Sequence, residues 1–351
     1  MTEHGVRAAF AHCQPAAGVA PLPGPAHYWD SSAVDLAAFL RAQNADWLWV
    51  QLSAYGYSRW GAPYRLGKAL ASIKRQLPGL RLAVYLHETH CDAGQLGWKG
   101  PVLSPWQKHT VGRVARLADV VFTSTRLWRE RALASYGLSP ERVILLPIGS
   151  NLPRVVLSPE QRAAERQARG WGANEAIGVI FGSFPIQQRA LERFEPLLRA
   201  GRASGRLDRV VCIGGDQADP PLELRRWQER LPGPLDILGH RPAGEVATVL
   251  ACCDYGFPAT PRCLLEKSGG FAAFAEAGLA VIAITAPYPD TSDDLPVITA
   301  SEWNQINAGR QSGLGAQLQE LANHKYSWNR LAQRALAHLA QSFQPQAVVL
   351  Q

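Results

Sequence analysis

Residues 262–283, RCLLEKSGGFAAFAEAGLAVIA, contain the local signals for a helix followed by a strand. Ser268, Gly269 and Gly270 are typical of a helix N-terminus, and Gly278 ends the helical stretch before a strand predicted at 279–285. Backbone N–H groups at a helix start attract phosphate, and Lys267 would add a point cation. The same residues also suit an ordinary capped helix beside a solvated lysine, so both interpretations stay open.

The same alternation of strand and helix runs through both halves of the chain. Short apolar runs predict further strands in the second half at 176–184, 209–216, 235–240 and 255–260. In the first half they predict strands at 46–52, 80–86, 119–124 and 142–147, with helical spacing between them. Strands that alternate with helices in this way favour parallel sheets with helices on both faces.

The length of 351 residues suits two domains. Residues 151–175 are rich in charge, proline and glycine and contain no predicted strand, so we expect the connection there. We predict an N-terminal domain at 1–155 and a C-terminal domain at 170–327. A final helix is predicted at 328–343, and we expect residues 328–351 to cross back onto the first domain.

Composition limits the class of protein. Apolar residues make up 47% and charged residues 19%, as in globular proteins. The net charge of +7 is spread along the chain, which argues against nucleic acid as a partner and favours an anionic ligand. The six cysteines include no CxxC pair, and the sequence shows neither a signal-like N-terminus nor a membrane-spanning apolar run. We therefore predict a cytoplasmic protein that touches a membrane at most peripherally.

Residues 82–91, LAVYLHETHC, place several polar side chains at the end of a predicted strand. His87, His90 and Cys91 are three and four residues apart, which suits metal ligands on a helix but not on a strand end, so we predict no metal site. Two interpretations remain, a polar strand end without chemistry or an imidazole of His87 that faces a ligand cleft. In the second interpretation, Glu88 would fix the imidazole tautomer.

The loop QLSAYGYSRWGAP, 51–63, combines aromatic rings with glycines. Tyr55, Tyr57 and Trp60, beside Gln51, suit contact with the face of a sugar, although a turn with one buried aromatic side chain explains them equally well. Gly18 would let a ligand approach the backbone, or would simply form a turn.

Residues 108–131 gather basic side chains around one tryptophan. They form either a solvated helix face or a patch that rests on anionic lipid; the residues are Lys108, Arg113, Arg116, Arg126, Arg129, Arg131 and Trp128. Elsewhere, IGGDQ at 213–217 lacks GxGxxG, and neither GxxxxGK[ST] nor GxSxG occurs. The sequence therefore argues against a P-loop kinase and a serine hydrolase.

Several segments resemble one glycosyltransferase family, and they keep its order. Three segments are similar to GT-B glycosyltransferases of family 4: residues 118–153, 237–260 and 325–339, the last of which begins KYSW. A bacterial group of these enzymes has a YGY loop before a His-Glu pair. This chain resembles that group at residues 51–66, HETHCDAG (87–94) and LSPWQK (103–108).

This resemblance implies a GT-B fold, with two Rossmann-like doubly wound α/β domains facing across a cleft. It implies a metal-independent, retaining transfer of a sugar from a nucleoside-diphosphate sugar to a glycan, lipid-linked or small-molecule hydroxyl, with no cofactor. The diphosphate would contact Gly182, Ser183, Arg189, Lys267, Ser268 and Gly269. The nucleoside or sugar would contact Glu266, Gly239, Arg262 and Gly270, and the acceptor Gly18, Gln51, Tyr55 and Tyr57. His87 and Glu88 would lie nearest the chemistry.

The sequence also departs from the family pattern. The family's two glutamates, eight positions apart, would fall at Leu265 and Ala273, which leaves Glu266 as the one candidate. Ser183 stands where many members have arginine, and Arg189 lies close to the expected lysine. Two alternatives therefore remain, a GT-B protein that binds a nucleotide or glycan without turnover and, less favoured, an NAD(P)-dependent oxidoreductase.

Overall fold

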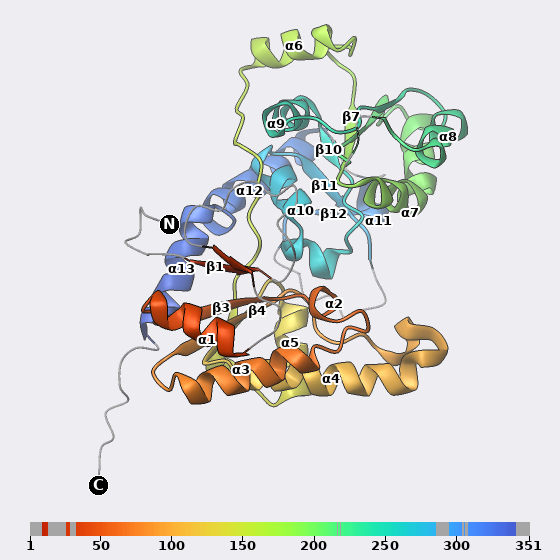
Figure 1. The fold of residues 1–351 in the computed structure, drawn as a ribbon. Helices are drawn as coiled ribbons and strands as arrows, with labels where there is room; N and C mark the ends of the chain where they lie inside the picture. The colour runs from red at the N-terminus through yellow and green to blue at the C-terminus, as the bar shows by residue number, and fades with distance from the viewer. Residues whose placement is uncertain are drawn as a thin grey trace. The chain divides into compact units, whose positions relative to one another are not determined.

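The computed structural model describes residues 9–12, 26–28, 33–215, 217, 219–285, 295–303, 305 and 308–341. It divides into two compact units (Figure 1). The first unit comprises Met1–Leu146 with Gln333–Gln351, and the second comprises Pro147–Ala332.

The first unit contains a four-stranded parallel sheet in the order β3-β4-β5-β6. Its strands are Trp47–Leu52, Arg81–Leu86, Val120–Thr123 and Val143–Leu145, which confirms the four predicted strands. A separate parallel pair consists of β1 (Phe10–His12) and β2 (Ala26–Tyr28). The helices are α1 (Ala33–Ala42), α2 (Ala54–Tyr57), α3 (Tyr64–Gln76), α4 (Gly100–Leu117) and α5 (Arg126–Tyr136), with short 3-10 segments η2 (Ala93–Lys99) and η3 (Pro140–Arg142).

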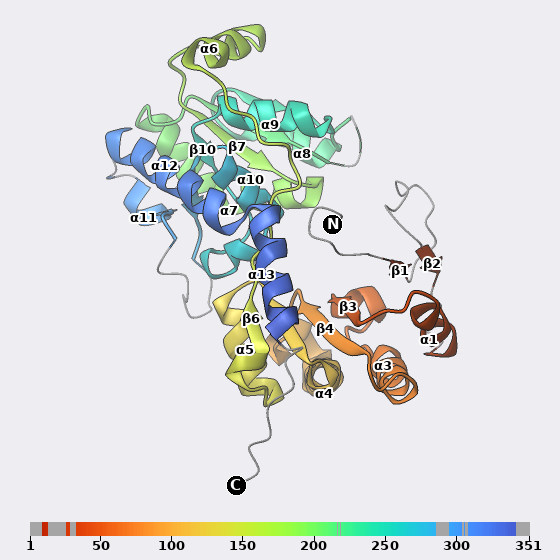
Figure 2. The same cartoon turned by 90° about the vertical axis from the view of Figure 1, so that its left-hand side faces the viewer.

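The two faces of this sheet carry different side chains, because successive strand residues point to opposite sides. Val50, Val84 and Val121 belong to a buried core that they share with α1, α3, α4 and α5. Figure 2 shows α3 and α4 on the same face of the strands. The other face carries an aromatic stack, in which the rings of Trp49 and Phe122 are 4.7 Å apart.

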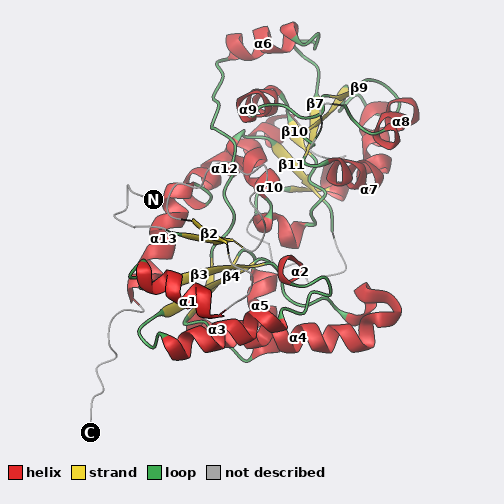
Figure 3. Ribbon diagram, viewed as in Figure 1, coloured by secondary structure: helices red, strands yellow, loops and turns green. Residues whose placement is uncertain are grey.

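The second unit contains a six-stranded parallel sheet in the order β12-β11-β10-β7-β8-β9. Figure 3 shows its strands β7, β9, β10 and β11 in yellow. The strands are β7 (Ile177–Phe181), β8 (Arg209–Ile213), β9 (Leu235–Ile237), β10 (Tyr255–Gly256), β11 (Ala280–Ala283) and β12 (Ile298–Thr299). The first strand, β7, is central, and the chain builds β8 and β9 on one side before it crosses to β10 on the other. The order reverses between β7 and β10, which is where sheets of this kind bind their ligands.

Helices cover both faces of this second sheet. Val179, Val211 and Val281 pack against α9 (Ala243–Cys252), α10 (Gly269–Glu276) and α12 (Ala308–Lys325). The alternate residues Ile180 and Cys212 pack against α7 (Phe184–Ala203) and α8 (Leu222–Arg230). Two short elements, η4 (Arg262–Lys267) and α11 (Ala300–Trp303), complete the described part of the unit. Burial on both faces explains why these strands read as continuous apolar runs.

Helix α6 (Pro159–Ala168) lies in the segment that we expected to connect the domains, and it belongs to the second unit. Two arginines tie it to Asp254, which precedes β10: Arg162 at 2.7 Å and Arg166 at 2.9 Å. The final helix, α13 (Trp328–Gln341), confirms the predicted closing helix. Its residues from Gln333 onward are grouped with the first unit, where Arg334 donates to the Leu145 carbonyl.

Candidate functional site

The candidate ligand site of the second unit lies at the carboxyl ends of β7 and β10. The loop after β7 contains Gly182 and Ser183, and the chain after β10 forms η4 and then α10. These segments are neighbours, because a Cβ atom on Gly270 would lie 3.6 Å from the Phe181 ring. The structure thus brings the two predicted phosphate-binding segments together at the switch point of the sheet.

The start of α10 combines a cap with free N–H groups. Ser268 Oγ accepts from the Phe271 N–H at 3.2 Å, so its hydroxyl serves as the helix cap. The N–H groups of Gly269 and Gly270 have no acceptor within the helix, because they belong to its first turn. Lys267 is half-buried at the end of η4, directly before the cap. These groups together form a polarised surface that suits a phosphate.

Three glycines let the strand-end loops pack backbone against backbone. Gly214 has φ +106°, and a Cβ atom there would lie 2.6 Å from the Gly182 carbonyl oxygen. Its N–H donates to the Gly239 carbonyl at 3.0 Å. Gly182 and Gly239 also have positive φ, +144° and +66°. Loop packing therefore accounts for these two predicted site glycines, and it ends β8 at Ile213, earlier than the sequence predicted.

The helix after β7 presents its polar residues in different ways. Ser183 is exposed at the N-cap of α7 without a side-chain cap bond, and Arg189 is exposed one and a half turns later. Gln187, which sequence reasoning missed, is fully buried, and its Nε2 donates to the Gly182 carbonyl at 2.7 Å. Its Oε1 has no partner among the described residues. Gln187 therefore holds the loop in which Gly182 and Ser183 lie.

Glu266 is the carboxylate of this site, and its side chain is only 13% exposed. Its Oε1 accepts from the Tyr326 hydroxyl at 3.0 Å and lies 2.6 Å from Lys325 Nζ. Both contacts use Oε1, so Oε2 has no partner in the described part of the chain. Burial raises the pKa of Tyr326, and the Glu266 carboxylate adds to this, so the hydroxyl stays protonated as a donor. Tyr326 belongs to the KYSW segment that the sequence analysis singled out, but its contact with Glu266 was not predicted.

The positions at which the resemblance would place glutamates are apolar and buried. Leu265 is 0% and Ala273 3% exposed, and both belong to the core between the sheet and α10. A carboxylate buried in such an apolar core costs free energy unless it is paired. Arg262, at the start of η4, is half-buried, and its backbone N–H donates to the Ile284 carbonyl at 2.9 Å.

In the first unit, polar side chains gather at the carboxyl ends of β3 and β4. His87 Nε2 lies 2.7 Å from Gln51 Oε1, and the imidazole is 4.7 Å from the Tyr85 ring. Glu88 accepts from Ser53 Oγ at 3.4 Å. The partner that the structure gives His87 is thus Gln51 rather than Glu88. A neutral His87 ring that donates to Gln51 carries its proton on Nε2.

The histidines of HETHC have separate partners. His90 is 8% exposed, and its Nδ1 lies 3.1 Å from the Tyr136 hydroxyl. Burial lowers the pKa of His90, and the nearby Arg131 guanidinium lowers it further. Among the described residues, no group of three or more His, Cys, Asp or Glu side chains is arranged to hold a metal ion.

The aromatic loop before α3 is fixed by α4. The Tyr55 hydroxyl accepts from Gln107 Nε2 at 3.0 Å, and the Tyr55 side chain remains 44% exposed. Tyr57 instead packs against the core of the first unit. Gly18, the fourth residue predicted to contact the acceptor, lies outside the described residues.

The tryptophan of the basic stretch at 108–131 does not form an aromatic surface. Trp128 is only 7% exposed, with the Arg131 guanidinium 5.5 Å from its ring. Arg129 donates to the Val143 carbonyl, and Arg131 pairs with Asp92 at 2.7 Å. Three residues of the predicted basic patch, Trp128, Arg129 and Arg131, thus take part in the packing of α5.

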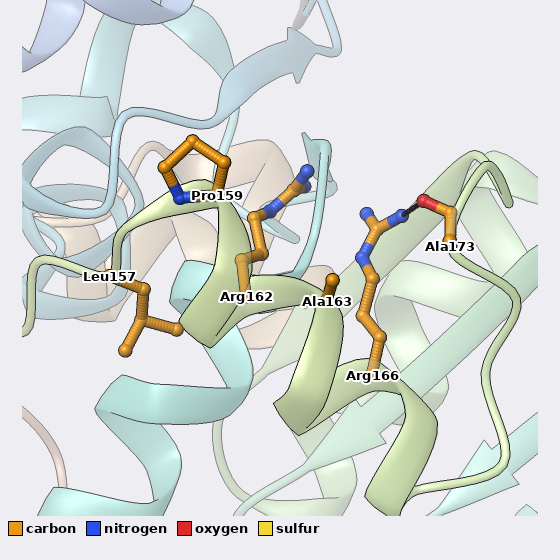
Figure 4. A pocket seen from close by; sticks show the side chains of 6 residues that line it. All are labelled: Leu157, Pro159, Arg162, Ala163, Arg166 and Ala173. Atoms are coloured by element: carbon orange, nitrogen blue, oxygen red, sulfur yellow. Dashed lines mark hydrogen bonds between the residues drawn. The ribbon is translucent and has the colours of Figure 1, made fainter.

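A cavity of about 250 Å³ beside α6 is structural in character (Figure 4). Its charged lining residues are Arg162 and Arg166, and both guanidinium groups bind Asp254 and backbone carbonyls. Because these guanidinium groups already donate to Asp254 and to backbone carbonyls, we assign the cavity no ligand.

Comparison with known proteins identifies the fold. No family model and no curated protein matches the sequence. A glycosyltransferase from Rickettsia africae has a TM-score of 0.62 at 12% identity, over 92% of this chain and 86% of that one. HepE of Anabaena in complex with UDP has a TM-score of 0.61 at 15% identity, over 90% and 86%. A UDP-forming trehalose-phosphate synthase from Burkholderia xenovorans has a TM-score of 0.63 at 13% identity, over 89% and 78%.

The protein is therefore an α/β protein built on parallel sheets. More specifically, it has the GT-B fold of glycosyltransferases, as the sequence predicted. The resemblance to family 4 and to its bacterial group stays a prediction.

Proposed function

We propose that the protein is a retaining, metal-independent glycosyltransferase that moves a hexosyl unit from a nucleoside-diphosphate sugar to a hydroxyl. The observation that carries this proposal is the start of α10, with Lys267 and Glu266 beside it, at the switch point of the second sheet. The similarity to GT-B enzymes supports it, since HepE was crystallised with UDP and the trehalose-phosphate synthase is UDP-forming. The acceptor is a glycan, a lipid-linked sugar or a small molecule, and we place the reaction in the cytoplasm.

In this proposal the second unit holds the donor. The N–H groups of Gly269 and Gly270, together with Lys267, bind the diphosphate, which gains charge as the glycosidic bond breaks. Ser183 and Arg189 contribute from α7. Glu266 Oε2 accepts hydrogen bonds from hydroxyl groups of the donor, and Ser268 supports the site as the cap of α10.

The first unit holds the acceptor. Gln51 orients His87 through their 2.7 Å contact, and the exposed ring of Tyr55 offers a face to a sugar. In a retaining reaction of this type the departing phosphate oxygen takes the acceptor proton, so no general base is assigned. No cofactor is needed for this chemistry.

A nucleotide panel tests the proposal directly. We expect UDP, GDP, ADP or TDP to raise the melting temperature, because a ligand at tenfold excess over its Kd stabilises the fold by about 1.4 kcal/mol. Differential scanning fluorimetry measures the shift, and NAD(P) serves as the comparison. No shift with any nucleoside diphosphate would contradict the proposal, and a shift with NAD(P) alone would favour an oxidoreductase. Slow donor hydrolysis would distinguish an enzyme from a protein that only binds.

Lys267→Ala tests where the diphosphate binds. We expect affinity for the nucleoside diphosphate to fall about tenfold, which corresponds to about 1.4 kcal/mol for one charge-assisted contact, while affinity for the nucleoside is unchanged. Isothermal titration calorimetry measures both ligands. Arg226→Ala, which removes an exposed cation from α8, is the matched control. Equal losses in the two variants, or no loss in either, would show that the diphosphate lies elsewhere.

A further inference from the structure

An exposed cluster of aromatic and aliphatic side chains covers the junction of η2 and α4 in the first unit. Trp98 is 87% exposed and Val102 73%, and Trp106 and Trp60 are partly exposed nearby. We propose that this cluster, which we name the Trp98 surface, rests on an anionic lipid bilayer. The proposal can be tested independently of the proposed function, because vesicle binding is measured without a donor or an acceptor.

The members of the Trp98 surface are held together by specific contacts. Lys99 Nζ lies 4.8 Å from the centre of the Trp60 ring and 5.2 Å from that of Trp98. Gln107 is buried, and its Nε2 donates to the Trp60 carbonyl at 2.7 Å, which ties the loop before α3 to α4. Val102 and Trp106 are four residues apart on α4, so they lie on the same side of that helix. Lys99 thus joins the Trp60 and Trp98 rings, and Gln107 joins the Trp60 loop to the helix that carries Val102 and Trp106.

The two chain segments that carry this surface contain basic residues and no acidic ones. The chain contains no acidic residue from 47 to 87, and none from 93 to 118. The basic residues in the same segments include Arg59, Arg65, Lys68, Lys99 and Lys108, of which all but the half-buried Lys99 are exposed. Acidic residues flank the segments, and of these Asp92 is paired with Arg131. An anionic partner is therefore favoured by charge.

The side chains identify that partner as a lipid surface. Tryptophan rings prefer the membrane interface, because the ring is apolar and its N–H is polar. Basic residues beside them gain about 1 kcal/mol each near an anionic leaflet. No helix in the described part of the chain is long and apolar enough to cross a membrane, so the contact we propose is peripheral. A surface of this composition matches that of interfacial helices.

Vesicle binding tests the proposal. We expect the full chain to sediment with vesicles of phosphatidylcholine and phosphatidylglycerol, and about tenfold less with phosphatidylcholine alone. Brominated lipid chains should quench part of the tryptophan fluorescence. The variant Trp98→Ser with Val102→Ser and Trp106→Ser should reduce sedimentation about tenfold and abolish this quenching. Lys99→Glu with Arg59→Glu should remove the preference for phosphatidylglycerol.

Matched controls make the outcome specific. Val156→Ser changes a valine of similar exposure, 70%, in the second unit, and Arg226→Glu reverses an exposed charge there. Both controls should bind vesicles as the unchanged protein does, and all variants should keep the same melting temperature. Equal loss in controls and variants would overturn the proposal. Vesicle binding without quenching by bromolipids would also overturn it. The proposal would fail as well if the variants of the Trp98 surface changed only the oligomeric state, as measured by light scattering.

Discussion

Replacing Asp254 by alanine is expected to lower the free energy of unfolding of the second unit by about 3 to 5 kcal/mol. The Asp254 carboxylate accepts from Arg162 Nη2 at 2.7 Å and from Arg166 Nη2 at 2.9 Å. It also accepts from the N–H of Ile177, at the start of β7, at 2.8 Å. The Arg166 side chain is 3% exposed, so the change leaves a buried guanidinium without its counter-charge.

Denaturant titration of tryptophan fluorescence measures this change. Asp219→Ala is the matched control, because its carboxylate is 93% exposed and lies 3.7 Å from Arg225. An exposed pair of this kind contributes about 0 to 1 kcal/mol. Asp254→Asn should lose less than Asp254→Ala, since an amide oxygen can still accept from Ile177. A loss below about 1 kcal/mol in Asp254→Ala would show that the contacts of α6 do not stabilise the unit.

The contrast between strands and ion pairs explains how much of the fold was predictable. The runs at 46–52 and 80–86 matched β3 and β4 closely, because a buried parallel strand reads as a local apolar run. Asp254 and Arg166 are 88 residues apart, and no local pattern links them. Helix α6 accordingly looked like a connection in sequence, although its arginines hold it to the second unit.

The candidate site shows the same division. The cap at Ser268 could be predicted because a serine before glycines is a local signal. The contact of Tyr326 with Glu266 spans 60 residues, so the closing segment and the site carboxylate were identified separately. His87 and Gln51 were given different roles in sequence. Their strands are neighbours in register, with Leu52 opposite Leu86, and this pairing brings the two side chains together.

Glu266→Gln is expected to weaken nucleoside-diphosphate binding by about 10- to 150-fold, because a hydrogen bond to a charged group contributes about 1.5 to 3 kcal/mol. The amide keeps the size of the side chain, and its oxygen can still accept from Tyr326. Lys325 is 33% exposed, so losing its counter-charge should change stability little. The expected loss is therefore one of binding rather than folding, and calorimetry with the nucleotide selected by the panel measures it.

A second ligand identifies which hydroxyl groups Glu266 accepts from. If they belong to the ribose, the 2′,3′-dideoxy nucleotide should bind the unchanged protein weakly, and Glu266→Gln should weaken it no further. If neither nucleotide loses affinity in Glu266→Gln but donor hydrolysis falls, Glu266 instead contacts the transferred sugar, which a nucleoside diphosphate lacks. Glu320→Gln removes an exposed carboxylate from α12 and should leave both affinities unchanged. If Glu266→Gln also leaves both affinities and hydrolysis unchanged, Oε2 does not face the donor, and the carboxylate serves only to fix Tyr326 and Lys325.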